Sequence, residues 1–252
     1  MNPILPVIGI TCHLALQKSP SGHIHGFHRV AAQYSRAILD AGGIPVIVGT
    51  AHGSTPAPPD MLTALDGLLL SGGTDLPSGS FGTGSCPTLR ETDPVRYDYE
   101  VELVRKAHGA GMPIMGICRG HQTLAESLGG RLILNIKEHD PNHFNHYQTD
   151  LPDSTSHDVV VPQGTRMHRW LGGAIRVNSF HRQAVARPPE GFTVSAVSED
   201  HLIEAIEAEA PFALGVQFHP EWLYTQHREF LSLFQAFIRA ASDYSKVRRR
   251  HG

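Results

Sequence analysis

The sequence Pro-Ile-Met-Gly-Ile-Cys-Arg-Gly-His-Gln, residues 113–122, decides how the rest of the chain is interpreted. It begins as a short apolar run, which is typical of a buried parallel strand. It turns at residues 116–120, and the apolar spacing that follows predicts a helix ending at the glycines 129–130. A glycine-flanked turn between a strand and a helix lifts one side chain above the sheet edge. Here that side chain is the thiol of Cys118, and a helix N-terminus favours its thiolate form.

A second segment supplies partners for this cysteine. Residues 215–222 read Gly-Val-Gln-Phe-His-Pro-Glu-Trp, and His219 and Glu221 lie at positions i and i+2 of an extended run. Both side chains therefore point to one side, where the imidazole can bond the carboxylate. A cysteine nucleophile needs a base, and the base needs an orienting group. We predict that Cys118, His219 and Glu221 form a catalytic triad; a packed cysteine and a surface ion pair are the plainer alternatives.

A third element is the pair Gly72-Gly73, at the end of a predicted strand. Acyl transfer needs hydrogen-bond donors where negative charge develops on the carbonyl oxygen, and backbone N–H groups are already oriented for this. We expect the N–H groups of Gly73 and Arg119 to form this oxyanion hole. An ordinary tight turn is the alternative for the two glycines.

Composition limits the class of protein. The chain has 252 residues, of which 40% are hydrophobic and 18% are charged, and its net charge is −3. This indicates a globular protein that binds neither nucleic acid nor membrane. Three cysteines cannot pair fully, and their spacing is not that of a zinc site, so a reducing compartment is expected. The N-terminus lacks the pattern of a signal peptide, and we expect a cytoplasmic protein without a cofactor.

The first half of the chain alternates predicted strands and helices. This alternation is typical of a parallel sheet covered by helices on both faces. Two stretches rich in Pro, Gly and Ser, residues 50–60 and 77–93, are expected to be loops. The predicted strands are residues 6–11, 44–48, 67–70 and 113–117, and the predicted helices are residues 28–41 and 94–108.

In the second half, short strands separated by turn residues predict antiparallel additions to the same sheet. An amphipathic helix over residues 228–241 closes the fold, and residues 245–252 are expected to be a frayed basic tail. We predict a single α/β domain over residues 1–252. The short strands are predicted at residues 131–136, 158–161, 174–178, 192–197, 202–206 and 212–218.

A histidine-rich loop, residues 139–157, follows the strand at 131–136. His143 and His146 are three residues apart, a spacing that could place two imidazoles on one metal ion. No glycine, cysteine or helix pattern accompanies them. We therefore predict no metal, and a lid over the substrate or a plain polar loop instead.

Several motifs, taken in order, resemble the class I glutamine amidotransferase-like superfamily. They are Gly-Ile-Cys-Arg-Gly-x-Gln, Asn-Ser-x-His-x-Gln, Ile-Glu-Ala-Ile-Glu and Gly-Val-Gln-x-His-Pro-Glu-Trp. Within the superfamily, the chain is similar to the gamma-glutamyl-gamma-aminobutyrate hydrolase branch over nearly its whole length. The resemblance implies a flavodoxin-like α/β sandwich with a Cys-His-Glu triad.

The resemblance also implies an activity, the cleavage of a gamma-glutamyl amide through a thioester, within polyamine catabolism such as putrescine degradation. It assigns Gln122 to holding the glutamyl group, and Asn178, Ser179 and His181 to the loop that lines the same pocket. The chain departs from the branch in two places. It has Arg182 where a second histidine is common after His181, and Tyr97 where an aspartate is usual. The identity of the amine that is released therefore stays open.

Two other functions stay open at this point. One is a glutaminase subunit that hands ammonia to a synthetase partner, and the other is a non-enzymatic binding protein on the same fold. His219 and Glu221 argue against the second, since such a protein needs no triad. The expected ligand is a small gamma-glutamyl molecule, and a homodimer is one oligomeric state to test.

Overall fold

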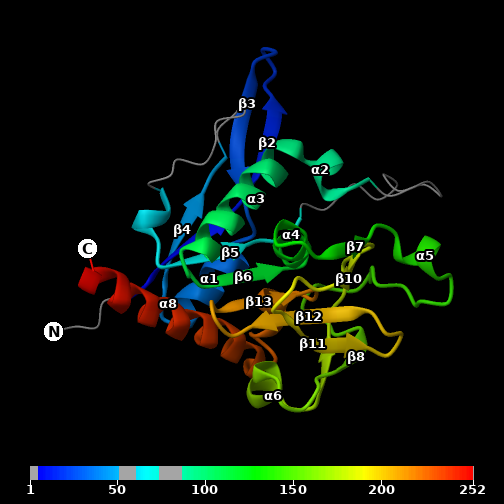
Figure 1. Ribbon diagram of the computed structural model, residues 1–252. Helices are drawn as coiled ribbons and strands as arrows, with labels where there is room; N and C mark the ends of the chain where they lie inside the picture. Colours follow the sequence, from blue (N-terminus) through cyan, green and yellow to red (C-terminus); the bar gives the residue numbers. More distant parts are fainter. Residues whose placement is uncertain (1–4, 51–60, 74–86, 252) are drawn as a thin grey trace.

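The computed structural model describes residues 5–50, 61–73 and 87–251 (Figure 1). Within these ranges one mixed sheet of 11 strands forms the centre, with the main order β4-β1-β5-β6-β13-β12-β11-β8-β9. Strand β10 joins this order by pairing with β12, and β7 joins it by pairing with β10. Strands β2 and β3 form a separate hairpin.

Neighbouring strands in the first five positions of this order are parallel to one another. All but the edge strand are almost completely buried, which explains why their sequences are continuous apolar runs rather than alternating patterns. The edge strand contains Pro45, which a central strand would not tolerate. The five strands are β4 (Ile44–Val48), β1 (Val7–Thr11), β5 (Gly67–Leu70), β6 (Ile114–Ile117) and β13 (Ala213–Val216).

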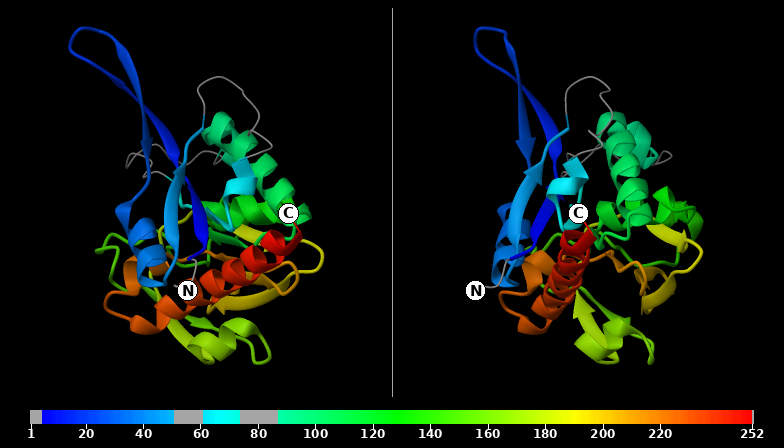
Figure 2. Two further views of the ribbon diagram at one scale, coloured as in Figure 1. Left: turned by 90° about the vertical axis from the view of Figure 1, so that its left-hand side faces the viewer. Right: turned by 60° about the vertical axis from the view of Figure 1, so that its left-hand side comes forward.

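Helices cover both faces of this parallel part (Figures 1 and 2). On one face α1 (Ala32–Asp40) packs on β4 and α8 (Leu231–His251) on β5. On the other face lie α3 (Pro94–Gly109) and α4 (Arg119–Ser127), which contact β5 and β6. The arrangement confirms the predicted flavodoxin-like α/β sandwich. The carboxyl ends of β5, β6 and β13 meet at one edge of the sheet, where ligands of such folds bind.

The second half of the chain extends the sheet with antiparallel strands, as predicted. The predicted strand at 212–218 has a mixed role, because β13 pairs in parallel with β6 and antiparallel with β12. These strands are β7 (Arg131–Ile133), β8 (His157–Val160), β9 (Ala174–Val177), β10 (Ala184–Arg187), β11 (Thr193–Ser198) and β12 (Ile203–Ala208).

The predicted helix at 28–41 is wrong at its start. His28 and Arg29 end β3 (Ile24–Arg29), which pairs with β2 (His13–Lys18) in a hairpin that projects from the sheet (Figure 2). Both strands leave most side chains in contact with solvent, so no buried apolar pattern marks them in the sequence. Their register is set by the turn, where Gly22 has φ of 88°.

Several short elements are absent from the sequence prediction. They are α2 (Leu89–Thr92), α5 (Ile136–His139), α6 (Arg166–Leu171), α7 (Pro220–Leu223) and the 3-10 turn η1 (Met61–Ala64). The helix predicted at 228–241 begins with the 3-10 turn η2 (Arg228–Phe230) before α8. The loop expected at 77–93 is therefore wrong for its last residues, where a capping box at Thr88 and Glu91 starts α2. Residues 77–86 and 51–60, also expected to be loop, lie outside the described residues.

The expectation of a frayed tail from residue 245 is wrong. Helix α8 continues to His251, and Arg248 donates a 2.8 Å hydrogen bond to Asp66, a fully buried residue that precedes β5. Arg248 also donates to the carbonyl of Thr63. Among the described residues, no helix is both long enough and apolar enough to cross a membrane.

Candidate active site

The turn between β6 and α4 has the sharp backbone expected of a nucleophile elbow. Cys118 has φ of 53° and ψ of −109°, a conformation that side chains rarely adopt. A Cβ on Gly116 would lie 2.5 Å from the carbonyl oxygen of Gly120, and a Cβ on Gly120 would overlap the carbonyl of Leu70. Both glycines are therefore required by close backbone approach, as the sequence predicts. The thiol is 8% exposed and borders a cavity.

His219 and Glu221 are paired at the end of β13. The Nδ1–H of His219 donates to Oε1 of Glu221 at 2.7 Å, and the carboxylate is completely buried. Cys118 lies beside the imidazole of His219, and both residues line the cavity. The main chain of His219 is held by Asn178, whose Oδ1 accepts from the His219 N–H at 2.7 Å. The three predicted triad residues thus lie side by side.

The charges of these neighbours change how His219 titrates. Burial, the largest influence, lowers its pKa, but the negative charges of Glu221 and Cys118 and hydrogen bonds to both outweigh burial. The pKa of His219 is therefore raised well above its ordinary value. Burial also raises the pKa of Tyr34 well above normal, and Glu221 and Cys118 add to this shift. The hydroxyl of Tyr34 accepts from the N–H of Gly72 at 2.9 Å.

The loop after β5 is held by a buried charge network. Arg96 on α3 donates to the carbonyls of Ser71 at 2.8 Å and Gly72 at 3.0 Å, and to Glu100 at 2.8 Å. Arg119 donates to the other oxygen of Glu100 at 2.5 Å. Burial raises the pKa of Glu100, but the two guanidinium groups outweigh it and hold that pKa below the usual range. The network fixes both segments predicted to supply oxyanion donors.

A cavity of about 370 Å³ opens beside the thiol. Gly73 and Arg119 are adjacent in its wall, because a Cβ on Gly73 would lie 3.4 Å from Cδ of Arg119. Gln122 is held there by hydrogen bonds from its Nε2 to the Gln183 carbonyl at 2.9 Å and to Gln217 Oε1 at 3.1 Å. The predicted site residues that line the cavity are Cys118, His219, Gly73, Arg119, Gln122 and His181.

Two residues predicted to line the pocket do not do so. Asn178 and Ser179 are fully buried and are absent from the cavity wall. Asn178 holds His219, and the N–H of Ser179 donates to Gln148 Oε1 at 2.7 Å. Both residues thus position other parts of the site, because their short side chains are consumed by main-chain hydrogen bonds.

The histidine-rich loop contributes in an unexpected way. Tyr147 and Pro152 line the cavity, so part of this loop is its wall. His143 and His146 face the carboxylate of Asp200 at 3.2 and 3.0 Å rather than the cavity. The side chain of Arg182 also lines the cavity and lies over the ring of Tyr147, 5.2 Å from its centroid.

Sequence reasoning missed the Arg96–Glu100 pair and Tyr34. A signal existed for the first, because Arg96 and Glu100 are four residues apart on a helix that follows a Gly-Gly turn. Nothing in the sequence around Tyr34 marks it as a neighbour of Gly72, since the two are 38 positions apart.

A sequence model of the family described as Peptidase C26 matches residues 6–221. The chain belongs to this family. It is 31% identical over 256 residues to an Escherichia coli protein named gamma-glutamyl-gamma-aminobutyrate hydrolase, covering 97% of both chains. It is 34% identical over 254 residues to a Mycobacterium tuberculosis protein provisionally named a glutamine amidotransferase, covering 95% of this chain and 76% of the relative.

Solved structures support the same fold. A Thermoplasma acidophilum protein, provisionally named as part of a GMP synthase, matches with a TM-score of 0.64 at 20% identity and with 98% of each chain covered. A Thermotoga maritima glutamine amidotransferase has a TM-score of 0.55 at 15% identity, covering 98% of this chain and 97% of that one. The predicted class I glutamine amidotransferase-like membership is thereby confirmed, and the family supports a hydrolase.

Proposed function

We propose that this protein is a cysteine-dependent hydrolase of gamma-glutamyl amines, such as gamma-glutamyl-gamma-aminobutyrate. The observation that carries the proposal is the contact of Cys118 with His219, which in turn bonds Glu221, at the wall of a cavity. The name of the Escherichia coli relative supports the substrate class. The resemblance to this branch also makes polyamine catabolism, such as putrescine degradation, the proposed setting.

In the first step, the sulfur of Cys118 attacks the δ-carbonyl carbon of the gamma-glutamyl group. The raised pKa of His219 favours the imidazolium form, which lies beside the sulfur before attack. His219 then gives its proton to the departing amine nitrogen as the C–N bond breaks. Glu221 holds the Nδ1–H of His219 and so fixes which nitrogen transfers the proton.

The oxyanion of the tetrahedral intermediate is stabilised by the N–H groups of Gly73 and Arg119. Loss of one such donor typically costs about 2.7–4 kcal/mol of transition-state stabilisation. In the second step His219 removes a proton from water, which attacks the thioester and releases glutamate.

Three arginines and one carboxylate, that of Asp93, line the cavity, and two of the arginines share the buried Glu100. The arginines are Arg96, Arg119 and Arg182. Guanidinium groups recognise carboxylates well, because their planar fork matches the two oxygens. We propose that Arg119 faces the α-carboxylate of the glutamyl group and that Arg182 favours a leaving amine that itself carries a carboxylate.

The decisive experiment measures glutamate release from a panel of gamma-glutamyl amines by the wild type and by Cys118→Ala. The wild type should turn over several amines, with aminobutyrate preferred, and Cys118→Ala should be inactive because it lacks the nucleophile. Cys12→Ala is the matched control, since it removes another buried thiol that is not part of the cavity wall. Wild-type turnover by Cys118→Ala would end the proposal.

A glutaminase subunit is the second candidate, favoured by the relatives and the solved structure named as amidotransferases. The same panel separates the two functions. Robust hydrolysis of gamma-glutamyl amines by the isolated chain supports the hydrolase. Hydrolysis of glutamine alone, and only after a synthetase is added, supports the amidotransferase.

A further inference from the structure

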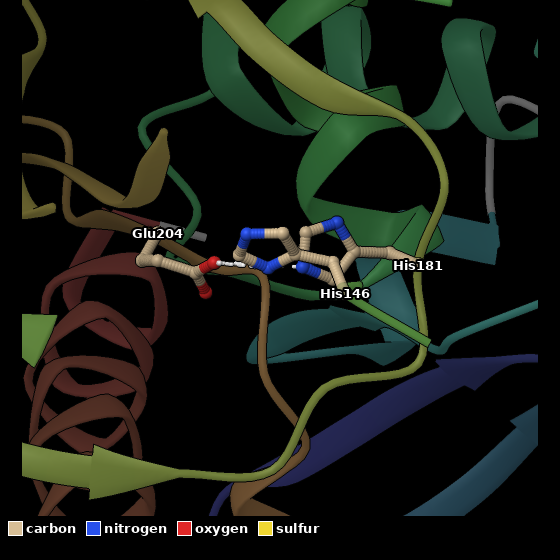
Figure 3. A group of neighbouring side chains, drawn as sticks. All are labelled: His146, His181 and Glu204. Carbon is tan, nitrogen blue, oxygen red and sulfur yellow. Dashed lines mark ion pairs between the residues drawn. The ribbon is translucent and has the colours of Figure 1, made fainter. Parts of the chain in front are cut away.

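A second group of titratable residues surrounds Glu204, and one of its members, His181, also lines the cavity. Glu204 on β12 is completely buried, and three imidazole nitrogens surround its Oε1 atom. His146 Nδ1 and His157 Nε2 lie 3.5 Å from Oε1, and His181 Nε2 lies 3.4 Å from it. Figure 3 shows Glu204, His146 and His181 converging on one point. We call these four residues the histidine cage.

The inward-facing atoms of the cage do not satisfy one another. Within the described residues, neither carboxylate oxygen of Glu204 has a hydrogen-bond partner, and neither has Nε2 of His157 or of His181. Buried polar atoms in folded proteins are nearly always bonded, so a group of unpaired atoms that faces one point requires an explanation.

Hydrogen bonds on the outer nitrogens fix how two of the imidazoles are protonated. His181 Nδ1 lies 2.9 Å from the carbonyl oxygen of Gln183, which can only accept, so Nδ1 carries a hydrogen. His146 Nε2 lies 3.0 and 3.2 Å from the carboxylate oxygens of Asp200, so Nε2 carries its hydrogen. A neutral imidazole then presents a lone pair on its inner nitrogen. Lone pairs that face a carboxylate oxygen repel it unless a cation lies between them.

The distances in the cage match those between ligands of one metal ion. Two ligands that each lie about 2.1 Å from a tetrahedral zinc ion are separated by about 3.4 Å. The ligand atoms of His146, His181 and Glu204 all lie within 4.8 Å of one another. The contact between His146 and Asp200 is the outer-shell arrangement that typically orients a metal-bound histidine.

We propose that the histidine cage binds a divalent transition-metal ion of the zinc class. His146, His181 and Glu204 are its ligands. The proposal departs from the sequence prediction of no metal in the histidine-rich loop. Imidazole and carboxylate ligands suit zinc, and all three ligands are buried, which suits an ion that holds segments of the fold together.

The ion has a clear structural task. His146 belongs to the loop between α5 and β8, His181 to the segment between β9 and β10, and Glu204 to the sheet. One ion would tie these segments together. The two segments also supply Tyr147 and Phe180 to the cavity wall, so the ion would hold the wall beside His219.

The test begins with the wild-type chain purified without chelators. Elemental analysis should find about one zinc-class ion per chain, and after chelation added Co²⁺ should bind saturably with the visible absorption of a tetrahedral site. Zn²⁺ should displace the Co²⁺. Absence of a bound ion together with absence of saturable Co²⁺ binding by chelated wild-type protein would overturn the proposal, and protonated imidazoles would then explain the cage.

Variants locate the ion. Glu204→Gln should abolish binding, and Asp200→Asn should weaken it about 10–100-fold, the usual effect of an outer-shell change. His25→Gln is the control, because His25 lies on the exposed strand β3 and its loss should change nothing. Should Glu204→Gln not fold, the Asp200→Asn titration decides alone. Unchanged Co²⁺ affinity in Asp200→Asn, or in a folded Glu204→Gln, would show that the ion binds elsewhere and overturn the proposal.

Discussion

Among the described residues, two buried glutamates face histidines, and the two arrangements differ in geometry. At the cavity, one imidazole and one carboxylate meet in a single hydrogen bond of 2.7 Å between His219 and Glu221. In the histidine cage, Glu204 faces three imidazoles at 3.4–3.5 Å without hydrogen-bonding any of them. The arrangement of His219 and Glu221 suits proton transfer, and the histidine cage suits the binding of a cation.

The difference also appears in how the histidines titrate. The carboxylate and the sulfur next to His219 raise its pKa well above normal despite burial. At His146, burial and the nearby His181 outweigh the carboxylates of Glu204 and Asp200, and its pKa falls to about 4. Burial thus decides the direction of the pKa shift at His146, whereas the neighbouring negative charges decide it at His219.

The largest expected effect separates the two sites by activity. Glu221→Gln should lower kcat on the order of 10⁴-fold, and His219→Ala on the order of 10⁶-fold, because the first removes orientation and the second removes the base. Glu204→Gln should stay within about tenfold of wild type, since Glu204 does not line the cavity. Steady-state glutamate release measures all three. A larger loss of kcat in Glu204→Gln than in Glu221→Gln would reverse the assignment of roles.

The second-largest expected effect concerns the stability of the histidine cage. Glu204→Gln should lower the free energy of unfolding by about 3 kcal/mol. Losses of this size are usual when one charge of a buried pair is removed and the other charge stays buried without a partner. Urea unfolding of the wild type and the variant measures this difference. Glu209→Gln, on an exposed position next to β12, is the control. A Glu204→Gln variant as stable as the control would show that the cage does not hold the fold together.

The smallest effect concerns pH. A histidine whose folded pKa is raised adds stability that is complete below its unfolded pKa of about 6.5 and is lost as pH rises through the folded value. The imidazolium also supplies the proton for the leaving amine, so kcat/KM should fall at alkaline pH. In Glu221→Gln that fall should begin at a lower pH, because the carboxylate no longer raises the pKa of His219.

A profile of kcat/KM against pH for wild type, Glu221→Gln and Glu209→Gln checks this expectation. An alkaline limb at the same pH in all three proteins would show that another group controls it.

The sequence predicted most of the parallel part of the fold, for a physical reason. Strands such as β5 and β6 are buried on both faces, and such strands must be continuous apolar runs. The β2–β3 hairpin was missed because every residue of β3 is exposed and no buried face constrains its sequence. The tail was misjudged because the contacts of Arg248 with Asp66 and with the carbonyl of Thr63 cross 182 and 185 positions.

The same reasoning explains the site. The elbow and the His-Pro-Glu turn are local patterns, so the sequence placed Cys118, His219 and Glu221 together, and the structure brings them into contact. Their catalytic roles stay a prediction. The histidine cage has no such pattern, because its ligands come from separate segments. Spacing rules for metal sites fail when the fold, rather than the local sequence, assembles the ligands.

The backbone conformation of Cys118 positions the nucleophile but lowers the stability of the fold. Its φ of 53° and ψ of −109° suit glycine and strain any residue with a side chain, on the order of 1–3 kcal/mol. Replacing the cysteine by glycine would relieve that strain, whereas alanine would keep it. The inactive Cys118→Gly variant should therefore unfold at a higher temperature than the wild type. At this residue the requirement for a nucleophilic side chain lowers the stability of the fold.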